Sequence, residues 1–530
     1  MQAFLLFRFY WQQNSFPDFR VSKLLLFLKI YNPLTIPKTQ FMKQLSTNIL
    51  LLAFSFLLAT CARNPVTGKR QVVLVSEAQE IAMGQEADPQ IVAQYGLYDD
   101  KALQAFITEK GKAMAAISHR PQLNYEFKVV DSDILNAFAV PGGYVYFTRG
   151  IMAHFNNEAE FAGVLGHEIG HITARHTVVQ QSKQLFGQLG LIAGIIIKPE
   201  LGQFAEQASQ GLGLLFLKFG RDAERESDKL GVEYSSKINY DASEMAGFFN
   251  TLARQGVASG AQELPDFLST HPNPGDRNVA VAKLAKEWKQ TLNLTNPQVN
   301  RDSYLKRIEG LVYGEDPRQG YVESNVFYHP ELKFQFNVPQ SWKYQNSPQR
   351  VQMAPQDGQA LMFLTLAPGK SLQEAGQTLV QQNNLQVIES RETTVNGLNA
   401  LYILADVKTD PQQQQQQQQQ QPPVRILSYL INDGGVIYLM LGASPANTFG
   451  NYSQYFSNTM QSFKKLTDLA RINKKPERVR IKTITANTTL EQALRSYKMP
   501  EKRFEELAIL NGMQRNTQLT KGMLIKIIDN

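Results

Sequence analysis

The stretch that decides the fold, residues 163–176, reads Gly-Val-Leu-Gly-His-Glu-Ile-Gly-His-Ile-Thr-Ala-Arg-His. It contains the pattern His-Glu-x-x-His at His167, Glu168 and His171. Apolar residues recur around it at helical spacing, which predicts a half-buried helix: Phe161, Val164, Leu165, Ile169 and Ile172. Residues four apart share one face of a helix, so both imidazoles point the same way. This geometry suits a zinc ion held by two histidines, with a glutamate beside it as a base.

Two common patterns of zinc peptidase are excluded by the residues that follow. The extended pattern with a third histidine needs Gly at position 174 and His at position 177, but the chain has Ala174 and Thr177. The second pattern has a glutamate ligand about 20 positions past the second histidine. In this chain such a residue would fall near Leu191, in a stretch without any acidic residue. The third ligand must therefore come from further along the chain, unless the helix carries only two ordinary histidines.

Two acidic residues spaced four apart offer this third ligand. Glu224 and Asp228 would share a helical face, so one could bind the metal while the other orients a liganding imidazole. The alternative is a solvated, charged helix. Further on, the chain has Thr270-His271-Pro272 and then Arg277.

Together these motifs resemble the family of zinc metalloendopeptidases that includes the bacterial BepA and HtpX proteins, the mitochondrial Oma-type proteases and the CAAX prenyl proteases. The resemblance covers residues 64–320. It implies a mostly α-helical, gluzincin-like catalytic domain over residues 62–323, with a small β-sheet beside the zinc helix. It also implies one zinc ion per chain, with a position left open for water and three protein ligands: His167, His171 and Glu224.

The same resemblance implies roles for the other residues of the site. Glu168 would be the general base that takes a proton from the zinc-bound water. Asp228 would hold a liganding histidine in its tautomer, and His271 with Arg277 would stabilise the oxyanion of the tetrahedral intermediate. A second hypothesis for His271 is a latch that occupies the open zinc position until substrate arrives, since neutral imidazole is a common zinc ligand. For His176 we find no better interpretation than a packed core histidine.

Capping signals predict where the helices begin. Ser76 and Gln79 predict a capping box at the start of one helix, and a second helical pattern covers residues 101–116. Asn157 predicts the cap of the metal helix, which we expect to end near Thr177. Two later apolar runs, residues 185–197 and 212–219, are too short to span a membrane and should form core helices or a mobile cover.

Strand signals lie just before the metal helix, over residues 125–130, 137–139 and 144–148. An exposed strand beside a metal site can pair with an extended substrate. We expect the segment from Tyr144 to Thr148 to play this part, or else to belong to a plain core hairpin.

The lone cysteine, Cys61, predicts export. It follows Lys43 and an apolar run over residues 49–58, which resembles a bacterial lipoprotein signal with its lipidated cysteine. We therefore interpret residues 42–61 as a signal peptide, with residues 1–41 as an extension upstream of the natural start. The expected product is lipid-anchored in the cell envelope and faces the periplasm, and Ala62 favours the outer membrane. The alternatives are a buried cysteine or plain secretory cleavage.

The composition is that of an ordinary globular protein with room for about three domains in 530 residues. Lys and Arg exceed Asp and Glu by 54 − 47 = 7. Since no dense basic run with interleaved aromatics occurs, we expect no nucleic-acid partner.

After the peptidase region, three further segments are expected. Residues 324–466 predict an α+β domain, faintly similar to PsbP-like modules, with a polyglutamine loop at 411–423. Residues 467–482 form a basic linker. Residues 483–530 resemble a LysM-like module of strand, two helices and strand, for which we consider both peptidoglycan binding and a structural role.

The resulting hypothesis is an exported zinc metalloendopeptidase that cleaves unfolded or misassembled envelope proteins. The main alternative is a non-catalytic envelope chaperone or assembly factor that uses the peptidase fold as a binding module. A cell-wall protein with a vestigial peptidase is a third option. Neither alternative explains why the chain contains a complete set of predicted zinc ligands together with a base.

Overall fold

The computed structural model describes residues 61–182, 219–258, 267, 270–271, 277–408 and 423–529. The predictions for residues 1–60, for the apolar runs at 185–197 and 212–218, and for most of the polyglutamine loop lie outside these ranges. Within these ranges, no helix combines the length and the apolar character needed to cross a membrane.

The first part of the described chain places two helices before a small sheet. A short pair, β1 (Cys61–Arg63) and β2 (Arg70–Val72), leads to α4 (Glu77–Tyr95) and α5 (Lys101–Ala115). Ser76 and Gln79 form the predicted capping box at the start of α4. The sheet has the order β3 (Glu126–Val130), β5 (Tyr144–Thr148), β4 (Ala137–Val140), so all three predicted strands are confirmed.

The order of this sheet corrects one prediction. Strand β5 pairs in parallel with β3 on one side and antiparallel with β4 on the other. Every residue of β5 is buried. Because both of its edges are already paired, β5 cannot accept a substrate strand, and the core alternative is correct. Within the described residues, β4 and not β5 is the sheet's edge on the side of this hairpin.

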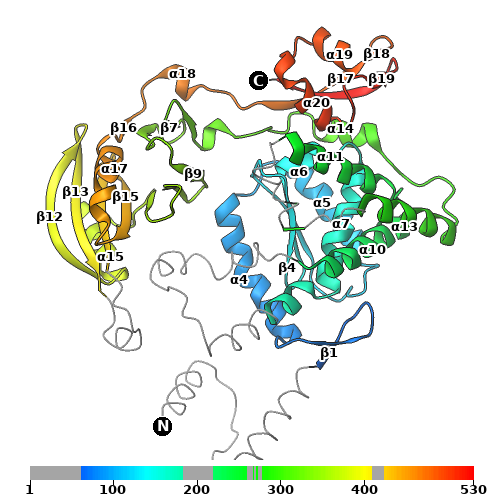
Figure 1. The fold of residues 1–530 in the computed structure, drawn as a ribbon, viewed down its shortest axis with the longest axis horizontal. Coiled ribbons are helices and arrows are strands. Elements are labelled where there is room, and N and C mark those ends of the chain that lie inside the picture. Colours follow the sequence, from blue (N-terminus) through cyan, green and yellow to red (C-terminus); the bar gives the residue numbers. More distant parts are fainter. Residues whose placement is uncertain are drawn as a thin grey trace, which may run out of the picture. The chain divides into compact units, whose positions relative to one another are not determined.

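Among the residues that the structure describes, six α-helices follow this sheet: α6 (Arg149–His154), α7 (Glu158–Thr173), α10 (Arg221–Lys237), α11 (Glu244–Ala258), α13 (Arg277–Thr291) and α14 (Arg301–Arg307). Helix α7 carries the His-Glu-x-x-His pattern and packs against α5, α10 and α11 (Figure 1). All of its residues are buried, although the sequence predicted a half-buried helix. The helix ends at Thr173, earlier than expected, because Arg175 adopts a left-handed backbone with φ 60°.

Glycines allow α7 and α10 to lie unusually close together. A Cβ atom added to Gly231 on α10 would lie 2.9 Å from the backbone oxygen of Gly163 and 3.1 Å from the backbone nitrogen of His167. A Cβ atom on Gly166 would lie 3.0 Å from the Cα atom of Gly231. Only residues without a side chain permit this approach, which brings the acidic residues of α10 to the histidines of α7.

The next part is rich in β-structure, with a seven-stranded antiparallel sheet (Figure 1). Its order is β12 (Leu385–Val395), β13 (Leu398–Val407), β14 (Val424–Asp433), β15 (Val436–Pro445), β11 (Leu361–Leu366), β10 (Arg350–Ala354) and β9 (Lys343–Asn346). A four-stranded sheet has the order β16 (Lys464–Lys465), β8 (Phe334–Asn337), β7 (Val326–His329) and β6 (Tyr321–Glu323). The polyglutamine run falls between β13 and β14, as predicted.

The central strands β14 and β15 of the large sheet are buried on both faces. Met440 of β15 packs with the four-stranded sheet and with α17 (Phe449–Gln461). The next residue, Leu441, packs on the other face with α15 (Leu372–Gln382). Side chains alternate between the faces of a strand, so the apolar run in β15 supplies two cores at once.

The C-terminal part has two strands, two α-helices and two strands in this order, whereas the sequence predicted a single strand on either side of the two helices. It contains β17 (Arg478–Thr483), β18 (Thr488–Thr489), α19 (Leu490–Ser496), α20 (Phe504–Leu510), β19 (Gln518–Leu519) and β20 (Leu524–Asp529). Strand β17 begins inside the predicted linker because it pairs with β20. The linker also contains the short helix α18 (Leu469–Ile472), and Lys474 lies 4.0 Å from the ring centre of Tyr321. Much of the expected linker is therefore ordered structure.

Candidate metal centre

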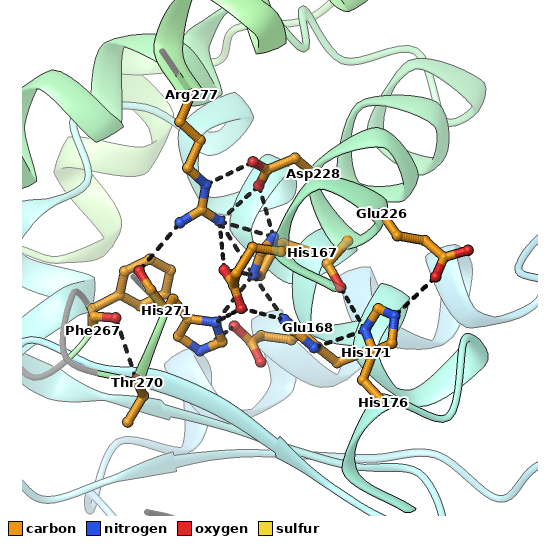
Figure 2. Close-up of polar contacts among 12 residues, drawn as sticks. His167, Glu168, His171, His176, Glu226, Asp228, Phe267, Thr270, His271 and Arg277 are labelled. Atoms are coloured by element: carbon orange, nitrogen blue, oxygen red, sulfur yellow. Dashed lines mark hydrogen bonds and ion pairs between the residues drawn. The ribbon is translucent and has the colours of Figure 1, made fainter. Parts of the chain in front are cut away.

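Two packed helices place most of the predicted site residues. Asn157 caps α7 as predicted, since its side chain accepts a hydrogen bond from the backbone N–H of Glu160. His167 and His171 then lie one turn apart on the face of α7 that meets α10. Glu224 of α10 reaches the same point, and Figure 2 shows His271 beside the two histidines.

Four buried side chains converge as a group that could hold a metal ion: His167, His171, Glu224 and His271. Their ligand atoms all lie within 4.8 Å of one another. The Nε2 atoms of His167 and His171 are 3.0 Å apart, and Glu224 Oε1 is 3.5 Å from His171 Nε2. The side chains of all four are at most 2% exposed.

The chemistry of this group fits zinc. Imidazole nitrogens and a carboxylate oxygen are the ligands that catalytic zinc sites use. Glu224 Oε2 is buried and makes no hydrogen bond to the part of the chain that the structure describes, although Arg277 Nη2 lies 3.2 Å away as an ion pair. Burial acts to raise the pKa of Glu224, but the neighbouring groups of His271, His167 and Arg277 outweigh it and hold the pKa below its usual value. The carboxylate is therefore kept in the charged form that binds a metal.

Asp228 contacts His167, one of the predicted metal ligands. Its Oδ1 atom lies 3.0 Å from His167 Nδ1. A hydrogen on Nδ1 leaves Nε2 of His167 free to bind a metal, which is the role expected of Asp228. Burial acts to raise the pKa of Asp228, but Arg277 and the hydrogen bond from His167 lower it below its usual value.

Arg277 binds carboxylates in the structure. Its Nε and Nη2 atoms donate to the two oxygens of Asp228 over 2.6 and 2.7 Å. A bidentate pair of this kind fixes the orientation of a carboxylate. The resemblance implied that Arg277 and His271 form an oxyanion-binding pair. In the structure Arg277 is bound to Asp228, whereas His271 lies within the group that could hold a metal ion.

Glu168 lies beside the ligand group with a carboxylate that makes no hydrogen bond to the described residues. It is fully buried, and its Oε1 atom is 3.6 Å from Nε2 of His271. Burial raises the pKa of Glu168 above its usual value, against the lowering effect of His271 and His167. A buried carboxylate with free lone pairs and a raised pKa suits a group that both accepts and returns a proton.

His271 joins the ligand group through a turn of the chain. Its backbone N–H donates to Phe267 over 2.8 Å, and the two rings stack with their centres 4.6 Å apart. Its Nδ1 atom lies 3.1 Å from Glu224 Oε1 and 3.3 Å from His167 Nε2. Burial acts to lower the pKa of His271, but the carboxylates of Glu224 and Glu168 raise it above its usual value.

Two aromatic contacts and one hydrogen-bonded pair at the site were not predicted. The ring of Phe219 stacks on His171 with the ring centres 4.2 Å apart, and Phe267 stacks on His271. His176 contacts both His171 and Glu226. The sequence signal for this pair is that each member follows a predicted ligand within a few residues, at positions 171 and 224.

Residues 101–285 match the model of peptidase family M48. This match spans both helices of the site and the segment that carries His271. Residues 101–285 are a peptidase family M48 domain. Peptidases of this family depend on zinc, in agreement with the ligand group found in the M48 domain.

The M48 domain also has named relatives. The mitochondrial metalloendopeptidase OMA1 of Arabidopsis thaliana is 33% identical over 188 residues, which cover 35% of this chain and 36% of the relative. The beta-barrel assembly-enhancing protease of Escherichia coli (strain K12) is 27% identical over 245 residues, covering 45% of this chain and 49% of the relative. The match therefore spans about a third to a half of the length of these two relatives.

Solved structures also resemble part of the chain. The cyanobacterial PsbP protein of Synechocystis is 12% identical, with a TM-score of 0.21, and the match covers 28% of this chain and 91% of that protein. The yeast Ran-binding protein Mog1p is 11% identical, with a TM-score of 0.20, and the match covers 25% of this chain and 90% of that protein.

Proposed function

We propose that this chain is a zinc-dependent metalloendopeptidase. The observation that carries the proposal is the buried carboxylate of Glu168, which makes no hydrogen bond to the described residues and lies beside a group of metal ligands. A pure binding module needs no such base, since an unsatisfied buried carboxylate costs stability. Zinc held by this group would polarise the scissile carbonyl and increase the acidity of the attacking water.

The residues of the chain then carry the proton and hold the site together. Glu168 takes one proton from the water as its oxygen bonds to the carbonyl carbon, and returns it to the amide nitrogen as the carbon–nitrogen bond breaks. Asp228 holds His167 in the metal-binding tautomer. Arg277 in turn fixes Asp228. The two products together contain the atoms of one added water molecule: the new carboxyl group has its oxygen, and the new amine has one of its hydrogens.

Glu168→Gln tests the proposal. The amide has the same shape but cannot take a proton, so we expect cleavage of casein to fall by about 100-fold or more. Zinc content should stay at one ion per chain, measured by atomic emission on the purified protein. Glu109→Gln, on the exposed face of α5, is the matched control and should cleave normally. Equal cleavage by Glu168→Gln would favour a non-catalytic chaperone instead.

We further propose that the substrates are unfolded or misassembled envelope proteins. Support comes from a relative whose name is beta-barrel assembly-enhancing protease. The inactive Glu168→Gln protein should retain such substrates, and cross-linking in cells followed by mass spectrometry would identify them. Recovery of non-envelope proteins alone would contradict this substrate class.

The proposed location rests on the residues around Cys61. We propose a lipid anchor on this cysteine in an exported protein, with the outer membrane favoured. Mass spectrometry of the mature N-terminus would detect the lipid, and an unmodified Cys61 would contradict it. Peptidoglycan binding by residues 483–530 stays a prediction, which a cell-wall pull-down of the full chain with and without these residues would test.

A further inference from the structure

His176 lies next to His171, one of the proposed metal ligands. It is 7% exposed, and it follows the break in the helix at Ala174 and Arg175. Its Nδ1 atom is 3.1 Å from Nδ1 of His171. Its Nε2 atom is 3.0 Å from Oε2 of Glu226 on α10 (Figure 2).

The hydrogens in this chain of contacts can be assigned from chemistry. His171 presents Nε2 to the ligand group, so a metal-binding His171 must carry its hydrogen on Nδ1. That hydrogen needs an acceptor, and the nitrogen facing it is Nδ1 of His176. His176 must then carry its own hydrogen on Nε2, where Glu226 offers a carboxylate that can only accept.

Ser227 provides an independent check on this assignment. Its buried hydroxyl oxygen lies 3.2 Å from the same Nδ1 atom of His176. A hydroxyl can donate to an unprotonated ring nitrogen, and the single lone pair of this nitrogen would then be shared between Ser227 and His171. The contact of Ser227 is therefore compatible with an acceptor at Nδ1 of His176.

We propose that Glu226 and His176 are positioning residues of the metal centre: Glu226 fixes the tautomer of His176, and His176 accepts the Nδ1 hydrogen of His171 and leaves Nε2 of His171 free for the metal. The inference rests on the proposed zinc site. His167 obtains the same effect directly from Asp228. Both histidines on α7 are thus linked to a carboxylate of α10. His167 contacts Asp228 directly, and His171 is linked to Glu226 through the imidazole of His176.

Zinc affinity of the full-length protein, measured by competition with a chelator, tests the inference. Removing a partner that orients a zinc ligand weakens zinc binding by about 10-fold to 100-fold. We expect this loss for His176→Phe, which keeps a ring but has no acceptor. His176→Asn can place an oxygen near the position of Nδ1 and should recover most of the affinity. The absorption spectrum of the Co²⁺-substituted protein should shift for His176→Phe and return for His176→Asn.

A second pair of variants covers the case in which His176→Phe does not fold. The side chain of Glu226 is 24% exposed, so Glu226→Ala should fold and still lose zinc affinity. Glu233→Ala is the control, because Glu233 lies on the same helix with 18% exposure and pairs with Lys237 instead. Unchanged affinity in Glu226→Ala and in folded His176→Phe would overturn the inference, as would equal losses in His176→Phe and His176→Asn.

These results are separable from a failure of the proposed function. If Glu168→Gln cleaves like the unmodified protein while the His176 and Glu226 variants lose zinc, the catalytic proposal is wrong and the positioning role stands. If the protein cleaves with zinc but these variants bind it normally, only the positioning role is wrong.

Discussion

At the scale of single residues, two conflicting hypotheses for His271, a latch and an oxyanion donor, can be separated by one substitution. Its Nδ1 atom lies within the ligand group, 3.1 Å from Glu224 Oε1, which is where a fourth ligand would stand. In that position it would block access of water and substrate. We therefore expect His271→Ala to raise cleavage of an unfolded substrate several-fold, as measured by fluorescent casein release.

An oxyanion donor would give the opposite result. Its removal typically lowers kcat by about 100-fold to 1000-fold. A loss of that size in His271→Ala, with zinc still bound, would exclude the latch and restore the role that the resemblance implied. His329→Ala, in the β-rich region, is a control histidine with its ring nitrogen near Leu332 and should leave cleavage unchanged.

Sequence and structure agree on which residues meet at the site but differ on what some of them contact. The spacing of His167 and His171 predicts their shared face because helical geometry is local. The contacts of Arg277 depend on where α13 packs against α10, which no local period contains. The resemblance implied that Arg277 donates to the oxyanion. In the structure its guanidinium instead donates to the carboxylate of Asp228, which in turn contacts His167.

At the scale of elements, the close approach of α7 and α10 depends on glycine. In Gly231→Ala the new methyl group would meet backbone atoms of α7 at 2.9 and 3.1 Å, which cannot rotate away. We expect a stability loss of about 1–3 kcal/mol, the usual cost of overpacking. Because α10 carries Glu224, zinc affinity should fall as well. Urea unfolding with and without zinc measures both effects.

Gly247→Ala provides the contrast, since the nearest atom to its new methyl group would be 3.9 Å away. Alanine is the better helix former by about 1 kcal/mol, so this variant on α11 should be neutral or more stable. If Gly231→Ala behaves in the same way, the two helices do not depend on the missing side chain.

Element positions were predictable to the extent that they follow local patterns. The caps at Ser76 and Asn157 and the strand at β5 lie where the sequence placed them. The central position of β5 was not predicted, because strand pairing is set by residues distant in the chain. The early end of α7 was also missed, since Arg175 gives no composition signal for its left-handed backbone.

At the scale of the whole molecule, the C-terminal part shares a core with the M48 domain. Residues of β17, α19, α20 and β20 belong to the same cluster of buried side chains as the metal helix. A polar contact joins them too, since Arg254 of the M48 domain donates to the backbone oxygen of Met513 over 2.7 Å. Arg301 of α14, which follows the M48 domain in the chain, donates to the backbone oxygen of Leu524 over 3.0 Å. The sequence pattern predicted a separate module because local patterns specify each of its helices and strands. Its burial against residues more than 200 positions earlier in the chain leaves no sign in such local patterns.

Lys526 tests this integration. Its side chain is fully buried, and its Nζ atom donates to the backbone oxygens of Ala153 and Phe155 over 2.9 and 3.0 Å, at the end of α6. Helix ends leave carbonyl groups that need donors, and a buried acceptor that loses its donor costs about 1–3 kcal/mol. Lys526→Met keeps the length but not the donor, so its unfolding midpoint in urea should fall. Because α6 leads directly into the cap of α7, the unfolding of the M48 domain should shift with it as one transition.

Lys521→Met is the control, because Lys521 is exposed on the same C-terminal part, and this variant should not change the midpoint. A separate, earlier transition confined to the C-terminal part would instead mean that this part folds on its own and only rests against the M48 domain.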